Sequence, residues 1–318
     1  VKVATLATAL VVASNSVISL QAVNNDNSNA TFLDENSVTS PIIISEIVAD
    51  SHQSDMITAN GSDAFEYFEL YNTSNQSINL DDYQVLYDNG STISEWNLPA
   101  NTVLPANQAL IVWVKNEVSK DLELELFREY YNLSANEGQI VKTENIVSGF
   151  SNSGQRELQV TVKNTKQILS SVIYNDEDEK AQTKKGINFI YNSGRIQEST
   201  YSYDLDPTPG SLIEQQKLES KYQFVSVNDG TVTVNTVQEI NAGEALVVKA
   251  TTNLSGVILK ATLKVNDKEY DMTYDSDGSY VYSVPASEIS NADILNITAT
   301  FNDGINEITS AKQTVRVN

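Results

Sequence analysis

Short runs of apolar and β-branched residues, separated by turn-forming residues, follow one another along the chain from Pro41 onward. The clearest runs are YQVLYD (83–88), ALIVWVK (109–115), ELQVTVK (157–163) and ILSSVIY (168–174). Runs of this length and composition, bounded by Asn, Asp, Ser, Gly and Pro, are typical of strands in antiparallel sheets. The pattern therefore predicts an all-β unit over residues 41–212.

One segment departs from the strand pattern. In SKDLELELFREYYNL (119–133), Leu122, Leu126, Phe127 and Tyr130 recur at helical spacing, and Ser119 is a suitable N-cap. The alternation of Leu122, Leu124 and Leu126 competes for a strand. We favour a short helix inserted over residues 119–133.

A second strand-rich stretch begins after Gly210. The polar segment SLIEQQKLES predicts a linker, placed at residues 213–220, and residues 221–318 then alternate apolar and polar positions in ALVVKAT, ILKATLKV, SYVYSV, DILNITATF and QTVRV. This spacing is typical of a β-sandwich. The fold class expected for the chain is all-β, with two sandwich domains in tandem.

The N-terminus has the pattern of an export signal. Lys2 precedes the apolar run VATLATALVVA (3–13), which is too short to span a bilayer and suits a signal peptide of residues 1–22. A buried helix of the fold is the alternative. The polar residues 23–40 are predicted to form a flexible leader. No later run is long enough for a membrane helix, so we expect a secreted or surface-held product.

Composition restricts the chemistry. The chain has 318 residues, no cysteine, a single histidine (His52) and a formal net charge of −22. Disulfides, thiolate zinc sites, a Cys nucleophile and multi-histidine metal sites are therefore excluded. The negative field disfavours nucleic acid, since proteins bind phosphate backbones through Lys and Arg. His52, in DSHQSD beside Asp50 and Asp55, is interpreted as a loop residue without a catalytic role.

The stretch DAFEYFELYN (63–72) raises the question of a catalytic carboxylate pair. Glu66 and Glu69 are three residues apart, which would place them on one face of a helix and on opposite faces of a strand. The aromatic content and the flanking turn residues favour a strand. We therefore expect two separate acids, each solvated or capping a backbone group, rather than a catalytic pair.

Two further acidic segments were considered as cation sites. NDEDEK (175–180) has no glycine to fold ligands inward, and is interpreted as a solvated loop, with a weak cation site as the alternative. DSDG (275–278) has its glycine in the fourth position and lacks the later Glu of a calcium loop, so a hairpin turn is favoured. SNSGQR (151–156) is also predicted to be a turn. No catalytic residue, metal ligand or cofactor is therefore assigned.

Several segments occur in an order known from one family. IIISEIVADS, DAFEYFELYNTSNQSINLDDYQVLY, EWNLPANTVLPANQALIVWVKN, GFSNSGQRELQV and DPTPGSL resemble a lamin tail domain of the bacterial extracellular type, over about residues 41–212. The resemblance implies an immunoglobulin-like β-sandwich without a catalytic centre. The segment 221–318 is similar to Ig-like modules that follow such domains in secreted metallophosphoesterases and nucleases. The Asp-x-His, Gly-Asp and Gly-Asn-His elements of those enzymes are absent from this chain.

Three functions are compatible with these patterns. The first is a secreted, non-catalytic accessory, targeting or binding region, and the second is the N-terminal part of a secreted metallophosphoesterase or nuclease whose catalytic domain would follow. The third is an adhesin-like binder of a cell-wall polymer, glycan or protein. Its contacts would come from whichever aromatic residues are exposed instead of filling the core, among Tyr67, Tyr71, Tyr83, Tyr87, Trp96 and Trp113.

Overall fold

A computed structural model describes residues 38–52, 63–176, 179–193, 195–224, 230–254, 256–289 and 293–318. Within these ranges the protein consists of strands with two short α-helices, so the all-β prediction is confirmed. The signal peptide predicted at residues 1–22 lies outside the described residues, as does most of the leader. Val38 and Ser40 are buried, so the end of the expected flexible leader is part of the fold.

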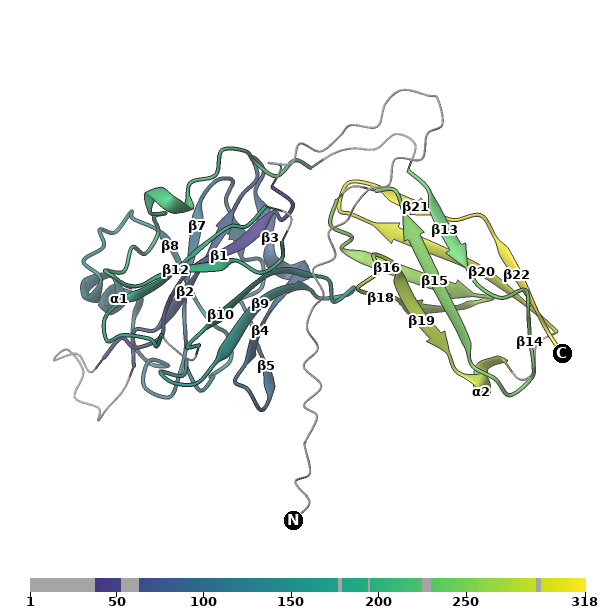
Figure 1. Cartoon of the computed structure of the whole chain (residues 1–318), viewed down its shortest axis with the longest axis horizontal. Coiled ribbons are helices and arrows are strands. Elements are labelled where there is room, and N and C mark those ends of the chain that lie inside the picture. Colours follow the sequence, from purple (N-terminus) through teal and green to yellow (C-terminus); the bar gives the residue numbers. More distant parts are fainter. Residues whose placement is uncertain are drawn as a thin grey trace, which may run out of the picture.

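The strands fall into two units, coloured purple to green and green to yellow in Figure 1. The elements of the first unit are β1 (Ile42–Val48), β2 (Tyr67–Asn72), β3 (Ile78–Asn79), η1 (Leu80–Asp82), β4 (Tyr83–Asp88), β5 (Ile93–Trp96), β6 (Val103–Leu104), β7 (Ala109–Trp113), α1 (Leu124–Tyr130), β8 (Gln139–Lys142), β9 (Arg156–Val162), β10 (Ile168–Tyr174), β11 (Gly186–Ile190), β12 (Ser199–Leu205) and the 3-10 turn η2 (Glu214–Gln216).

The first unit is a sandwich of two sheets. One sheet has the order β12-β11-β1-β2-β7-β8, and the other has the order β10-β9-β4-β5; β3 and β6 form a separate pair. A continuous apolar core between the sheets contains Phe68, Leu70, Val85 and Trp96. The larger sheet is also covered on its other face, where Tyr67 and Trp113 pack with Phe127 of α1. Burial on both faces explains why IIISEIV in β1 is apolar at nearly every position.

The second unit is also built from two sheets. Its elements are β13 (Val232–Asn235), β14 (Glu239–Ile240), β15 (Leu246–Thr252), β16 (Lys260–Val265), β17 (Lys268–Asp271), β18 (Thr273–Tyr274), β19 (Tyr280–Val284), α2 (Ala286–Ile289), β20 (Ile294–Asn302), β21 (Glu307–Thr309) and β22 (Gln313–Val317). The sheets have the orders β13-β15-β19-β18 and β14-β22-β20-β16-β17, with β21 paired to β20. A separate apolar core lies between them.

The inserted helix is shorter than the sequence indicates. It occupies Leu124–Tyr130 and begins at Glu123, which makes no side-chain capping hydrogen bond, so the predicted Ser119 N-cap is wrong. Ser119 is buried: its Oγ accepts the N–H of Asn116 at 2.9 Å and donates to the carbonyl of Val114 at 2.9 Å. A hydroxyl that closes a turn has the same sequence preference as one that caps a helix, which accounts for the error.

The segment predicted as a linker packs against the first unit. Gln216 is buried, and its Nε2 donates to the carbonyls of Ser45 (2.6 Å) and Phe189 (3.0 Å). Tyr222 is also buried in the first core, and its N–H donates to Thr73 O at 3.0 Å. The segment predicted as a linker is therefore bonded to two strands of the larger sheet, β1 and β11, before the second unit begins.

We expect Gln216→Ala to lower the free energy of unfolding by about 2 kcal/mol, because two buried carbonyls lose a donor. Chemical denaturation followed by tryptophan fluorescence measures this, since Trp96 and Trp113 are both in the first unit. Gln215→Ala is the matched control, because Gln215 is exposed in the same turn. Equal destabilisation of the two variants would contradict the anchoring role of Gln216.

The tip of the β9–β10 hairpin contacts the second unit. Thr165 Oγ1 donates to Ile258 O (3.1 Å), and the carbonyl of Thr165 accepts the N–H of Tyr274 (2.7 Å). The Oδ1 of Asn164 accepts the N–H of Ala261 at 3.1 Å. Two side chains and one carbonyl of this tip thus bond to backbone groups of the second unit, in addition to the chain that connects the two units.

Candidate functional site

Glu66 and Glu69 are both buried, each with 1% of its surface exposed, so the expectation of solvated acids is wrong. The expectation of backbone capping holds. Glu66 Oε1 accepts the N–H of Phe150 at 2.9 Å, and Glu69 Oε2 accepts the N–H of Gly210 at 2.6 Å. The two side chains share no hydrogen-bond partner among the described residues. Burial raises the pKa of Glu66 well above its usual value, and the nearby Asp63 carboxylate adds to the shift.

A different carboxylate pair does exist in the first unit. Glu46 of β1 lies directly opposite Glu69 of β2, next to a register shift at Ser45. Glu46 is 1% exposed and accepts hydrogen bonds from the hydroxyl of Tyr67 and from Asn188 Nδ2 (3.1 Å). Glu46 is not among the candidate residues that the sequence pattern indicated. The available signal was an acid within the largely apolar run IIISEIV, since a charge in a strand that is covered on both faces needs partners.

The pair holds the closing segment DPTPG (206–210) against the sheet. The N–H of Thr208 lies 3.1 and 3.2 Å from the two oxygens of Glu46, and the N–H of Gly210 donates to Glu69. Burial raises the pKa of Glu46 to about 7 and that of Glu69 to about 8, and the charge of Glu46 adds to the shift of Glu69. Because both acids are covered and engaged by backbone donors, the arrangement is suited to anchoring the chain.

The loop around His52 contains a second group of acids. The backbone N–H of His52 donates to Asp63 Oδ1 at 3.0 Å, and Asn152 Nδ2 donates to Asp63 Oδ2 at 3.2 Å. Burial raises the pKa of Asp63, and the Asp50 carboxylate contributes. Asp55 lies outside the described residues. His52 therefore takes part in this loop through its main chain.

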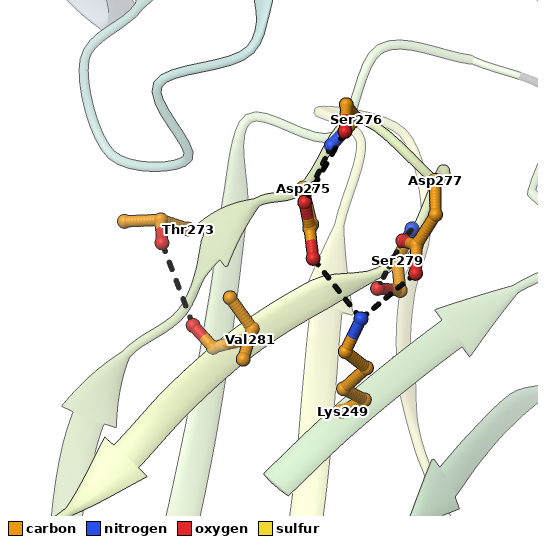
Figure 2. Close-up of polar contacts among 7 residues, drawn as sticks. All are labelled: Lys249, Thr273, Asp275, Ser276, Asp277, Ser279 and Val281. Carbon is orange, nitrogen blue, oxygen red and sulfur yellow. Dashed lines mark hydrogen bonds and ion pairs between the residues drawn. The ribbon is translucent and has the colours of Figure 1, made fainter. Parts of the chain in front are cut away.

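In the second unit, DSDG forms the tight turn between β18 and β19, as predicted. Gly278 N donates to Asp275 O at 3.0 Å, and Asp275 N donates to Ser279 O at 2.7 Å. Figure 2 shows the ammonium of Lys249, from β15, between the two aspartates. Its Nζ is 3.0 Å from Asp275 Oδ2 and 2.8 Å from Asp277 Oδ2. The lysine thus occupies the position that a metal cation would need.

We expect millimolar Ca²⁺ to leave the melting temperature of the second unit unchanged, because the Lys249 ammonium already lies between Asp275 and Asp277 and is ion-paired with both. Thermal unfolding with and without Ca²⁺ measures this. Lys249→Ala is the informative comparison, since it leaves the two carboxylates without their internal cation. A Ca²⁺-dependent rise in the melting temperature of the unchanged protein would contradict the assignment.

The acidic segment 175–180 lies only partly within the described residues, since Glu177 and Asp178 fall outside them. Asp176 Oδ1 accepts the N–H of Glu179 at 3.0 Å, as in a capped turn. Across the described ranges, no group of three or more His, Asp or Glu side chains is arranged to hold a metal ion. Nor does any helix there have the length and hydropathy to span a bilayer.

Five of the six aromatic residues considered as binding contacts are buried. They are Tyr67, Tyr83, Tyr87, Trp96 and Trp113, all with at most 6% of their surface exposed. Tyr71 is the exception: it is half-buried at the end of β2. It lines a hollow of about 680 Å³ together with Asn107, Gln108, Ala109, Asn136, Gly138, Gln139, Gly210, Ser211, Leu212 and Lys217.

A second, smaller hollow of about 400 Å³ lies at the other sheet, between the β4–β5 turn and the segment 148–156. Arg156 lines it with Tyr87, Asn89 and Ser151. Tyr87 and Ser151 hydrogen-bond to each other here, at 3.0 Å from the N–H of Ser151 to the tyrosine hydroxyl. SNSGQR thus forms a turn, as predicted, and contributes one wall of this hollow.

Comparison with known proteins finds one family model that is similar to part of the first unit. Residues 35–176 match the Lamin Tail Domain model. The lamin tail domain is a non-catalytic, immunoglobulin-like fold, in agreement with the sandwich described above. The matched range contains Glu46, Glu66, Glu69 and the helix α1.

Two individual proteins are similar to the chain. The uncharacterized protein YvnB of Bacillus subtilis (strain 168) is 20% identical over 184 residues, which is 57% of this chain and 14% of YvnB. The chain thus spans about one seventh of that relative's length. A solved structure concerning host cell surface retention of a 1.5-MDa bacterial ice-binding adhesin aligns with 89% of this chain and 99% of that one, at 13% identity and a TM-score of 0.23.

Proposed function

We propose that this chain is a non-catalytic accessory region that holds or binds another molecule at the exterior of a bacterial cell. The observation that carries the proposal is the use of the buried carboxylates. Glu46 and Glu69 lie side by side as a catalytic pair would, but they receive the backbone N–H groups of Thr208 and Gly210. Acids that are covered by their own chain stabilise the fold and leave no access for a substrate. The lamin tail domain match supports the same interpretation.

The test is an activity assay on the purified chain. Model phosphodiester and nucleic-acid substrates are incubated with the protein in Mn²⁺, Ca²⁺ or Zn²⁺, and no turnover above a protein-free control is expected. Turnover that copurifies with the chain and disappears in Glu46→Gln or Glu69→Gln would overturn the proposal.

Export is supported by the charge and apolar pattern of residues 1–22. Residues 1–40 fused to a reporter enzyme are expected to direct it into the medium of a bacterial culture. Leu10→Arg is the matched control, because a charge in the apolar run should retain the reporter inside the cell. Equal export of both fusions would contradict this part of the proposal.

A second candidate is the same accessory role within a longer protein, with a metallophosphoesterase or nuclease domain beyond this chain. The coverage of only 14% of YvnB supports a longer parent protein, and the catalytic domain is the part of this candidate that remains to be tested. Reading the genomic sequence past the codon for Asn318 decides between the two candidates. A continuing frame with paired metal-binding motifs supports the second, and a frame without them opposes it.

A further inference from the structure

The hollow at Tyr71 is assembled from four separate parts of the first unit. Tyr71 is the last residue but one of β2, Asn107 and Gln108 form the turn before β7, Asn136 precedes β8, and Ser211 follows the closing segment. Its volume of about 680 Å³ lies within the range of roughly 300–1,000 Å³ that is typical of ligand pockets.

Five polar side chains that line this hollow have no hydrogen-bond partner among the described residues. The side chains of Tyr71, Asn107, Gln108, Asn136 and Ser211 make no hydrogen bond to any described residue, whereas Gln139 uses its Nε2 on Val103 O (3.0 Å) and leaves its Oε1 free. Amide and hydroxyl groups offer both donors and acceptors. The lining can therefore serve a ligand that carries many hydroxyl groups.

Charge narrows the class of ligand. Lys217 provides the one charged side chain of the lining, and it is ion-paired with Glu214. With no free cation, the hollow is unsuited to an anionic ligand, and the overall charge of −22 would repel one further. Its many polar groups make it equally unsuited to a lipid or another apolar ligand. A neutral, hydroxyl-rich ligand satisfies both conditions.

The apolar part of the lining suits the same ligand. Tyr71 and Leu212 line the hollow beside the amides. A tyrosine presents a rigid ring that can pack on the C–H face of a sugar ring, while its hydroxyl stays available for hydrogen bonding. It orders few rotatable bonds on binding, which limits the entropy cost.

The wall of the hollow is held in place before any ligand arrives. Gly138 and Gly210 both have positive φ angles, and a Cβ on Gly210 would lie only 3.1 Å from the Cα of Gly138. The N–H of Gly210 is fixed by the buried Glu69 at 2.6 Å, and the N–H of Asn107 donates to Ser74 O at 3.1 Å. A preformed wall raises affinity because little ordering remains to be done on binding.

We propose that this hollow binds a segment of a neutral polysaccharide, with Tyr71 as the packing platform and Asn107, Gln108 and Asn136 as hydrogen-bonding groups. The inference rests on the proposed function of an external accessory region and gives that function a ligand class and a site.

The experiment is affinity gel electrophoresis of the full chain in gels containing soluble neutral polysaccharides: xylan, mixed-linkage β-glucan, galactomannan, starch and glycol chitin. Retardation by at least one is expected. Tyr71→Ala and the double variant Gln108→Ala/Asn136→Ala are expected to weaken that affinity about tenfold or more. Gln108 and Asn136 are exposed, so the double variant keeps the fold.

Tyr201→Ala is the matched control, because Tyr201 is a more exposed tyrosine on β12, 44% accessible, and does not line the hollow. It is expected to bind as the unchanged protein does. Thermal unfolding of each variant confirms that the fold is kept.

Three results would overturn the inference and would leave the proposed accessory role standing. One is retardation that is unchanged in both pocket variants, which would place glycan binding elsewhere. Another is the absence of retardation by any neutral polysaccharide. Retardation only in gels containing an acidic polymer, run in parallel, would likewise reject a neutral ligand. The accessory role itself fails only on catalytic turnover in the separate activity assay.

Discussion

Replacing Gly149 by alanine is expected to lower the free energy of unfolding of the first unit by about 3 kcal/mol, combining backbone strain with overpacking. Gly149 has φ +83°, a region that L-residues rarely adopt. A Cβ there would lie far inside the contact distance of Glu66 Oε2. Glu66 cannot move aside freely, because its oxygens hold the N–H of Phe150 (2.9 Å) and Asn116 Nδ2 (3.2 Å).

Gly90→Ala separates the cost of backbone strain from the cost of overpacking against Glu66. Gly90 has nearly the same φ, +84°, in the same unit, but its Cβ would meet only ordinary contacts, the nearest being Arg156 Nη1 at 3.5 Å. It is therefore expected to cost only the backbone strain, about 1 kcal/mol. Urea denaturation monitored by tryptophan fluorescence measures both variants. Equal losses would mean that the contact with Glu66 contributes nothing.

The strands were predictable because their signal is local. YQVLYD, ILSSVIY and QTVRV each carry the composition of a strand within a few residues, and they correspond to β4, β10 and β22. The turn at DSDG was predictable for the same reason, since the position of Gly278 within it decides the turn. The position of Lys249 between Asp275 and Asp277 could not be predicted from the sequence, because it depends on the pairing of β15 with β19.

The polar sites were not predictable because they depend on long-range pairing. The periodicity of one strand shows only whether Glu66 and Glu69 lie on the same face. The acid that actually lies beside Glu69 is Glu46, which belongs to another strand. The hollow at Tyr71 draws on residues from 71 to 217, and none of its segments has a motif of its own. The register between strands and the path of the closing segment determine which residues meet at both sites. Neither can be read directly from a single sequence.

A large pH effect is expected from the Glu46–Glu69 pair, in addition to that of the other buried acids, Glu66 and Glu198, whose pKa values burial also raises. Burial raises the pKa of these carboxyls to about 7 and about 8, from 4.5. A carboxyl with a higher pKa in the folded state keeps its proton where the unfolded chain has released it. The folded state then binds more protons, so the free energy of unfolding falls as pH rises through that interval. The contribution of this pair to the free energy of unfolding is fully present below about pH 4.5, is lost progressively as pH rises, and is gone above about pH 8.

For Glu46 alone, a rise from 4.5 to about 7 corresponds to about 3 kcal/mol lost by neutral pH. Glu69→Gln is expected to flatten this dependence and to make the first unit more stable than the unchanged protein at pH 8. The amide carries no charge to desolvate, its oxygen can accept the N–H of Gly210, and its NH₂ can donate to Ser45 Oγ, which now lies 2.6 Å from Glu69 Oε1. Urea denaturation between pH 5 and pH 8.5 measures the change. Glu125→Gln, at an exposed position on α1, is the matched control for removing one negative charge. If both variants followed the same curve, the pH dependence would come from overall charge, and the buried pair would have no part in it.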